Sequence, residues 1–238
     1  ANAIGNQAKA SGESSNAMGD NAQATGENSN AVGKNSAASA ASATALGTSA
    51  KATSISSNAI GNQAQANAEN ASAIGTAAQA LGINTNAVGK NAYANKQDAT
   101  AIGTAAEATD LNANAFGTGA KASADSANAI GNGAKASGIS TVAIGKSAQA
   151  TGLNANAFGT GANVASTNGL ALGAGATVTH SDAVALGSNS VSGAATPTTS
   201  AVVNGKTYSY AGIAPASTVS VGSIGNERQI TNVAAGRV

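Results

Sequence analysis

Side chains capable of acid–base, nucleophilic or metal chemistry are few in this 238-residue chain. There is one histidine, His180, and there is no cysteine, so a zinc, haem or iron–sulfur site has almost no ligands to draw on. A Cys nucleophile is absent, and a Ser-His-Asp triad would depend on His180 alone. His180 falls in an expected surface turn, which explains it more simply. We therefore predict no enzyme activity, no metal and no cofactor.

The carboxylates do not form a pair suited to general acid–base catalysis, which needs such groups held together around one substrate. They fall at expected turns or at outward strand positions, where they would solubilise the chain and protect its edges. These residues are Glu13, Asp20, Glu27, Glu69, Asp98, Glu107, Asp110, Asp125 and Asp182.

Composition excludes several further classes of protein. Only 2% of the residues are aromatic and 9% are charged, while 30 are glycine, so a conventional single core of large apolar side chains is excluded. The net charge is +1 with Lys and Arg scattered, which argues against nucleic acid as a partner. No apolar run is long enough for a membrane helix. The chain opens inside a repeat without a signal peptide, so we expect it to be a fragment of a longer protein.

The tetrapeptide x-Ala-apolar-Gly recurs every 14 residues, in 14 copies from Gly5 to Gly187. A disordered tract has no reason to hold one phase for so long, so the period indicates a repeat architecture. The apolar residues of the tetrapeptide form a single series, called the stripe below. They are Ile4, Met18, Val32, Leu46, Ile60, Ile74, Val88, Ile102, Phe116, Ile130, Ile144, Phe158, Leu172 and Leu186.

Each repeat is predicted to contain two short strands and two turns. With the Gly as position 0, positions +3 and +5 are mostly Ala and +4 is variable and often polar, as in Ala8-Lys9-Ala10. This alternation, like that of the Ala-apolar-Gly segment, indicates strands with one packed and one wet face. Residues that favour turns lie between the strands. They are Gly12, Gly26, Gly82, Gly138, Gly152, Asn28, Asn70, Asn84, Asp98, Asn112 and Asn154.

A stacked all-β solenoid follows from a two-strand repeat of constant length. Repeats about 4.8 Å apart would make a rod of roughly 65 Å. A helix is the alternative, but so many glycines oppose it at about 1 kcal/mol each. We expect Ala at −2, +3 and +5 and Gly at 0 to fill a thin interior.

The direction of the stripe remains open. Outside the roll, 14 apolar side chains would form a large exposed patch, which predicts a homo-oligomer with the stripe at a shared axis. The alternative places the stripe in the roll core, because a shift of one residue in register inverts the faces of a strand. The Asn residues at −3 are either a stacked amide ladder or turn residues before the strand, the role we favour. They are Asn2, Asn16, Asn30, Asn58, Asn86, Asn114, Asn128 and Asn156.

The period fails after Gly187, and the next match ends at Gly222, 35 residues later. Residues 200–210 predict a β-hairpin with a type I′ turn at Asn204-Gly205. Its tyrosines are a candidate ligand contact, but we favour a cap over the end of the solenoid, since solenoids require caps. The predicted organisation is a repeat domain at 1–192, a capping insertion at 193–218 and a final segment at 219–238.

The segment Ser220-Val221-Gly222, followed by Glu227-Arg228-Gln229-Ile230-Thr231-Asn232-Val233-Ala234-Ala235-Gly236, closely resembles the neck of trimeric autotransporter adhesins. The 14-residue repeats resemble the YadA-like head of that family. The family usually has Ser-Val-Ala-Ile-Gly, which Thr141-Val142-Ala143-Ile144-Gly145 matches best, whereas most repeats carry Asn in place of the Val. The implied neck residues are Val221, Gly222, Glu227, Arg228, Gln229, Ile230, Asn232, Val233 and Gly236.

The resemblance implies a left-handed parallel β-roll, three chains side by side, and a neck that leads to a coiled-coil stalk. It implies a homotrimer at the bacterial cell surface, held in the outer membrane by a C-terminal anchor outside this chain. Glu227 and Arg228 would pair between chains or lie exposed at a helix start, where they contribute little. Ile230 and Val233 have a spacing suited to the first core positions of the stalk.

Two functions follow from the resemblance. The first is a head that attaches to host extracellular matrix proteins or cell-surface receptors through many weak contacts in three copies. Its contacts would come from position +4 and the turns. The second is a structural spacer in a longer fibre. An ice-binding array is disfavoured, because position +4 mixes Lys, Gln, Ala, Tyr and Glu rather than presenting regular Thr.

Overall fold

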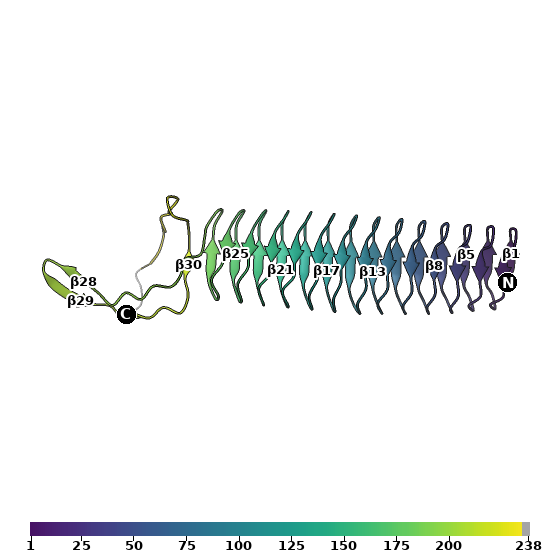
Figure 1. The fold of residues 1–238 in the computed structure, drawn as a ribbon, viewed down its shortest axis with the longest axis horizontal. Helices are drawn as coiled ribbons and strands as arrows, with labels where there is room; N and C mark the ends of the chain where they lie inside the picture. The colour runs from purple at the N-terminus through teal and green to yellow at the C-terminus, as the bar shows by residue number, and fades with distance from the viewer. Residues whose placement is uncertain (235–238) are drawn as a thin grey trace.

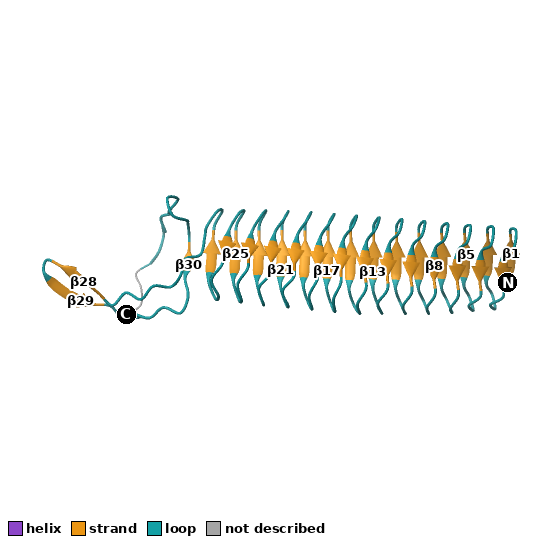
Figure 2. Ribbon diagram, in the orientation of Figure 1, coloured by secondary structure: helices purple, strands orange, loops and turns teal. Residues whose placement is uncertain are grey.

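The computed structural model describes residues 1–234, which form a long parallel β-solenoid followed by a less regular C-terminal part (Figure 1). Figure 2 shows strands and turns along the whole rod, and no helix occurs within residues 1–234. None of these residues therefore belongs to a helix that could cross a membrane. The all-β solenoid predicted from the 14-residue period is confirmed.

Two parallel sheets run the length of the rod, and each 14-residue repeat adds one strand to each, making one rung. The first sheet contains the three-residue strands. They are β1 (Asn2–Ile4), β3 (Asn16–Met18), β5 (Asn30–Val32), β7 (Thr44–Leu46), β9 (Asn58–Ile60), β11 (Ser72–Ile74), β13 (Asn86–Val88), β15 (Thr100–Ile102), β17 (Asn114–Phe116), β19 (Asn128–Ile130), β21 (Val142–Ile144), β23 (Asn156–Phe158), β25 (Leu170–Leu172) and β27 (Val184–Leu186).

The second sheet contains the two-residue strands. They are β2 (Lys9–Ala10), β4 (Gln23–Ala24), β6 (Ala37–Ala38), β8 (Lys51–Ala52), β10 (Gln65–Ala66), β12 (Gln79–Ala80), β14 (Tyr93–Ala94), β16 (Glu107–Ala108), β18 (Lys121–Ala122), β20 (Lys135–Ala136), β22 (Gln149–Ala150), β24 (Asn163–Val164) and β26 (Thr177–Val178). In both sheets each residue pairs with the residue 14 positions away, as Asn58 does with Ser72.

Two turns close every rung. The turn at positions 0 to +2 follows each first-sheet strand, and the turn at +7 to +9 precedes the next one. Each ends in a residue with a left-handed backbone, such as Asn35 (φ 56°) and Asn28 (φ 53°). Asn, Ser and Gly tolerate this conformation, and the turn roles predicted for Asn28, Asn70 and Asn84 are confirmed.

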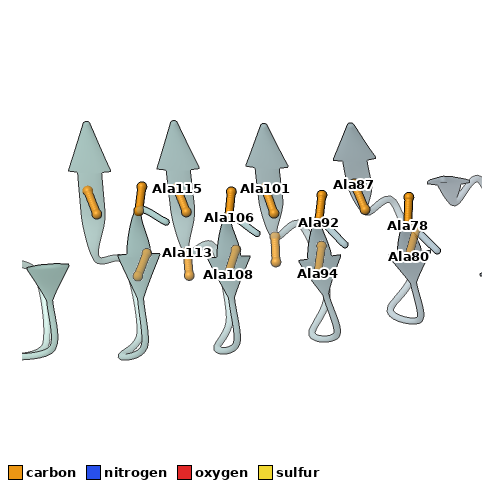
Figure 3. Close-up of a cluster of buried hydrophobic side chains, with 14 of the residues drawn as sticks. Ala78, Ala80, Ala87, Ala92, Ala94, Ala101, Ala106, Ala108, Ala113 and Ala115 are labelled. Carbon is orange, nitrogen blue, oxygen red and sulfur yellow. The ribbon is translucent and has the colours of Figure 1, made fainter. Parts of the chain in front are cut away.

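Alanine fills the space between the two sheets. Ala87, Ala92 and Ala94 are fully buried, and Figure 3 shows the same arrangement repeated in successive rungs. Positions −2, +3 and +5 are interior, as expected. Position −4 is interior too, and the sequence pattern had not revealed it; Thr85 occupies it with no exposed area and donates a hydrogen bond to the carbonyl of Gly82.

The glycine at position 0 is not interior filling, and that expectation was wrong. It lies partly exposed at the bend, with φ near +130°, as at Gly75. A Cβ on Gly75 would lie 2.6 Å from the carbonyl oxygen of Gly89 in the next rung. Glycine is therefore needed both for its backbone conformation and for the close stacking of the bends.

The regular rungs end at β27, and the chain rejoins the first sheet at β30 (Val219–Ser220), which pairs in parallel with β27. Between them, β28 (Ser200–Val203) and β29 (Lys206–Ser209) form the predicted hairpin, with positive φ at Asn204 and Gly205. The hairpin does not cover the end of the roll. Its two strands pair only with each other and project beyond β30 (Figure 1), and a capping role for the insertion at 193–218 stays a prediction.

Candidate functional site

The groups capable of chemistry are dispersed in the structure. The Nδ1 atom of His180 lies 3.2 Å from Thr179 Oγ1 and 3.2 Å from Ser192 Oγ, at a surface turn. Within residues 1–234, no three His, Asp or Glu side chains gather where they could hold a metal ion. The functional surface must therefore be sought on the outer faces of the roll.

The stripe lies on the outer face of the first sheet. Eight of its side chains are exposed, from Ile102 and Ile130 at 39% to Ile4 at 59%, and the other six are half-buried. Positions −4 and −2 face the interior instead, so the roll-core alternative is wrong. The reason is volume, because the space between the sheets accommodates a methyl group at most positions. A continuous apolar row on a free surface still lacks a partner within the single chain.

The Asn residues at −3 share the outer face of the first sheet with the stripe. They are strand residues, so the turn interpretation favoured for them was wrong. Some stack as an amide ladder: Asn2 Nδ2 donates to Asn16 Oδ1 at 2.9 Å, and Asn16 donates to Asn30 at 3.0 Å. Another pair, Asn114 and Asn128, is joined at 3.1 Å. These bonds explain how Asn is accommodated where the related motif has Val.

The outer face of the second sheet carries a mixed row at position +4. It comprises Lys9, Gln23, Ala37, Lys51, Gln65, Gln79, Tyr93, Glu107, Lys121, Lys135, Gln149, Asn163 and Thr177. Neighbouring rungs interact along it, as where Lys121 Nζ lies 2.9 Å from Glu107 Oε2. Such exposed pairs stabilise a fold only slightly, and the row is polar and available for contacts with other molecules.

A second apolar column, which the sequence analysis missed, lies in the turns at position +8. Ile55, Ile83, Leu111, Ile139 and Leu153 are exposed by 43–54%. The signal was present in the constant phase, since each residue lies eight positions after its Gly. Ala41 and polar or acidic residues occupy this position in the other rungs and break the column into separated patches.

The predicted neck residues meet the end of the roll through Arg228. Its guanidinium donates to Ser190 Oγ at 2.8 Å, to the carbonyl of Val221 at 2.7 Å and to the carbonyl of Ser188. Beside it, the Gly225 backbone N–H donates to Glu227 Oε1 at 2.8 Å, and this bond lowers the pKa of the Glu227 carboxyl. Arg228 thus ties the chain after β30 to the last turn of the roll.

The remaining neck predictions have mixed outcomes. Residues 227–234 contain no helix, so the helix-start alternative for Glu227 and Arg228 does not hold in the single chain. Ile230 and Val233 are each 69% exposed, and their place in a stalk core stays a prediction. Gly236 lies outside the described residues. A hollow of about 410 Å³ beside the neck is lined in part by Val191 and Ile224.

The geometry defines a class of protein: a rigid parallel β-solenoid that presents constant side-chain rows along its outer faces. The family model described as the YadA head domain repeat (2 copies) matches well over half of the chain. The matched residues are 3–22, 10–36, 24–50, 52–78, 94–120, 136–162 and 165–190. The chain belongs to the YadA head repeat family, as its motifs indicated.

The chain is similar to an autotransporter adhesin and to two proteins of known structure. Autotransporter adhesin BtaE of Brucella suis biovar 1 (strain 1330) is 49% identical over 51 residues, which are 21% of this chain and 7% of that protein. The C-terminal YadA-like domain of BPSL2063 from Burkholderia pseudomallei is 45% identical, covers 35% of this chain and 39% of its own, and has a TM-score of 0.32. The collagen-binding domain of Yersinia adhesin YadA is 22% identical, covers 91% and 78%, and has a TM-score of 0.26.

Proposed function

We propose that this chain is the head of a bacterial surface adhesin, displayed as a homotrimer and attaching to host extracellular matrix proteins or cell-surface receptors without catalysis. The observation that carries the proposal is membership of the YadA head repeat family, in which the relative BtaE is named an autotransporter adhesin. Surface display, an outer-membrane anchor outside this chain and the neck-to-stalk arrangement belong to the same proposal.

The rows along the roll support attachment by many weak contacts. Position +4 and both turns place a side chain outward in every rung, about 4.8 Å apart. Three copies triple each row, and repeated weak contacts on one rigid body raise avidity without any single strong site. The Ala-filled interior supports the same role, because a rod packed by short side chains leaves the outer positions free to vary.

The stripe supports the trimer. Its exposed apolar row lies on one flat face of the first sheet, and packing three such faces around a common axis would remove the row from water. A cyclic arrangement of identical chains is the expected solution for a surface of this kind.

Binding of the purified 238-residue chain to immobilised collagen, fibronectin, laminin and cultured cells tests the proposal, with sedimentation recording its oligomeric mass. We expect a trimer that binds at least one of these targets, with binding lost when the chain is made monomeric. A bacterium that adheres equally well after residues 1–192 are deleted, together with a head that binds none of the targets, would favour the spacer function.

A further inference from the structure

The charged residues of the roll, scattered in the sequence, are sorted by the fold between its two edges. We call the turns at positions 0 to +2 the Gly edge and the turns at +7 to +9 the leading edge, because the latter precede each first-sheet strand. Seven carboxylates lie on the leading edge: Glu13, Glu27, Glu69, Asp98, Asp110, Asp125 and Asp182. The other two carboxylates of residues 1–192, Asp20 and Glu107, each lie beside a lysine.

The lysines show the opposite distribution. Of the eight lysines in residues 1–192, three lie on the Gly edge, four lie in the second sheet between the two edges, and one, Lys96, lies on the leading edge. The seven are Lys34, Lys90 and Lys146, then Lys9, Lys51, Lys121 and Lys135. The leading edge therefore carries seven carboxylates and one lysine, whereas the Gly edge carries three lysines and one carboxylate, Asp20, although the net charge of the chain is only +1.

Rotational symmetry determines which edges meet in the trimer proposed above, on which this inference rests. Every first-sheet strand runs from the leading edge to the Gly edge, and the copies of a ring are related by rotation without a shift along the axis. The end of a strand in one copy therefore lies next to the start of the same strand in the next copy. The Gly edge of one copy meets the leading edge of its neighbour, whichever sheet faces the axis.

Strand β5 is the one strand of the first sheet with a carboxylate in the turn before it and a lysine in the turn after it. Glu27 lies in the turn before it and Lys34 in the turn after it. Both residues are exposed. The Lys34 side chain keeps 64% of its area accessible, and its Nζ atom lies 4.0 Å from Asp20 Oδ2, so this ion pair is a loose one. In a ring of three, Lys34 of one copy and Glu27 of the next come to the same height along the rod. Each seam then gains an ion pair that the single chain cannot form.

Lys90 and Lys146 follow Lys34 at intervals of four rungs. The residue facing each across the seam at the same height is apolar, Ile83 for Lys90 and Ile139 for Lys146, and it offers a surface for the lysine stem. On the facing leading edge, the nearest carboxylates lie one rung away. They are Glu69 and Asp98 for Lys90, and Asp125 for Lys146.

Strand β3 has a carboxylate on each side, since Glu13 precedes it and Asp20 follows it. Asp20 has Lys34 as a partner on its own edge, which offsets the unfavourable approach of two carboxylates. Lys34 thus lies near Asp20 of its own copy and near Glu27 of the next copy. Its charge therefore matters most for the association of the edges.

We propose that identical copies of this chain associate edge to edge, with the acidic leading edge of one against the lysines of the Gly edge of the next. The charge match favours the parallel cyclic arrangement. In a two-fold dimer joined through an edge, the same edge meets itself and like charges approach, which opposes that assembly. The sorted edges thereby favour a parallel ring over a two-fold dimer, and the apolar stripe is what favours the first sheet as the face toward the axis.

Exchanging the two charges tests the proposal in the intact 238-residue chain. Glu27→Lys and Lys34→Glu alone should each raise the concentration needed for half-maximal trimer formation by roughly tenfold at low salt, with a smaller effect at high salt. The double variant Glu27→Lys/Lys34→Glu re-forms the pair across each seam and should restore assembly. Lys51→Glu, on the second sheet between the edges, is the matched control and should leave assembly unchanged.

The double variant distinguishes a contact between copies from a contact within one chain. It restores an ion pair between position 27 of one copy and position 34 of the next, but it does not restore the ion pair with Asp20 of the same chain. Circular dichroism of each variant checks that the roll is folded. A wild-type trimer whose double variant assembles no better than the single variants overturns the edge-to-edge proposal alone. A wild-type chain that stays monomeric overturns the proposed trimer together with it.

Discussion

Glycine at position 0 shows how one residue type controls the solenoid. Its φ near +130° is a conformation that residues with a Cβ rarely adopt. The bends also stack so closely that a methyl group would meet the carbonyl of the next rung. Gly119 at position +2 differs, since it has φ +65° with open space around its Cβ direction, and Ala105 occupies the same position at φ 54°.

Replacing Gly75 and Gly119 separately by Ala should therefore have unequal effects. We expect Gly75→Ala to lower the free energy of unfolding by about 2 kcal/mol or more, from backbone strain and the contact with Gly89. Gly119→Ala, the matched control, should cost only about 1 kcal/mol, because Ala adopts the left-handed region at a modest cost. Urea denaturation of both variants measures the difference, and equal losses would contradict a specific requirement at position 0.

At the scale of the elements, the roll keeps the volume between its sheets nearly constant. The fully buried Val164 and Val178 replace the usual Ala at position +5 in two successive rungs. The residue at position −4 beside them is Gly169, where a Cβ would lie 2.6 Å from Val164 Cγ1 and 2.9 Å from Val178 Cγ1. Two larger side chains are thus offset by a missing methyl group.

Gly169→Ala should lower the free energy of unfolding by about 1–3 kcal/mol, the usual cost of overpacking a close-packed core. In a Val164→Ala/Val178→Ala background the same substitution should cost clearly less, because both Val contacts are removed and only the contact with Ser166 Oγ at 2.9 Å is left. Chemical denaturation of the four proteins forms a mutant cycle. A cost of Gly169→Ala that is the same in both backgrounds would show that the three residues do not share one space.

For the whole molecule, the outward stripe gives the head a surface that the single roll does not use. Ile60 is half-buried on the outer face of the first sheet, whereas the adjacent Ala59 has no exposed area. The two positions therefore separate assembly from folding. A charge at Ala59 would be enclosed without a partner, and a charge at Ile60 would be enclosed only if the chains meet.

We expect Ile60→Asp to change the stability of the isolated roll by no more than about 0.5 kcal/mol, while shifting the chain from trimer to monomer. Ala59→Asp should prevent the roll from forming. Sedimentation gives the mass and circular dichroism the fold. An Ile60→Asp protein that remains a trimer with unchanged thermal stability would mean that the stripe lies away from the axis.

Much of this architecture is determined by the sequence alone. A constant 14-residue phase, period-2 alternation and turn-forming Asn and Gly specify two short strands per rung, and Asn204-Gly205 specifies the hairpin turn. Local alternation divides a strand into two faces without stating which is enclosed. Only the tertiary structure decided that Ala lies between the sheets, that the stripe and the Asn residues face outward, and that the hairpin projects from the roll. The physical reason is that the burial of a side chain depends on the volume and charge of residues 14 or more positions away, in the neighbouring rungs. The sequence of a single repeat does not contain that information.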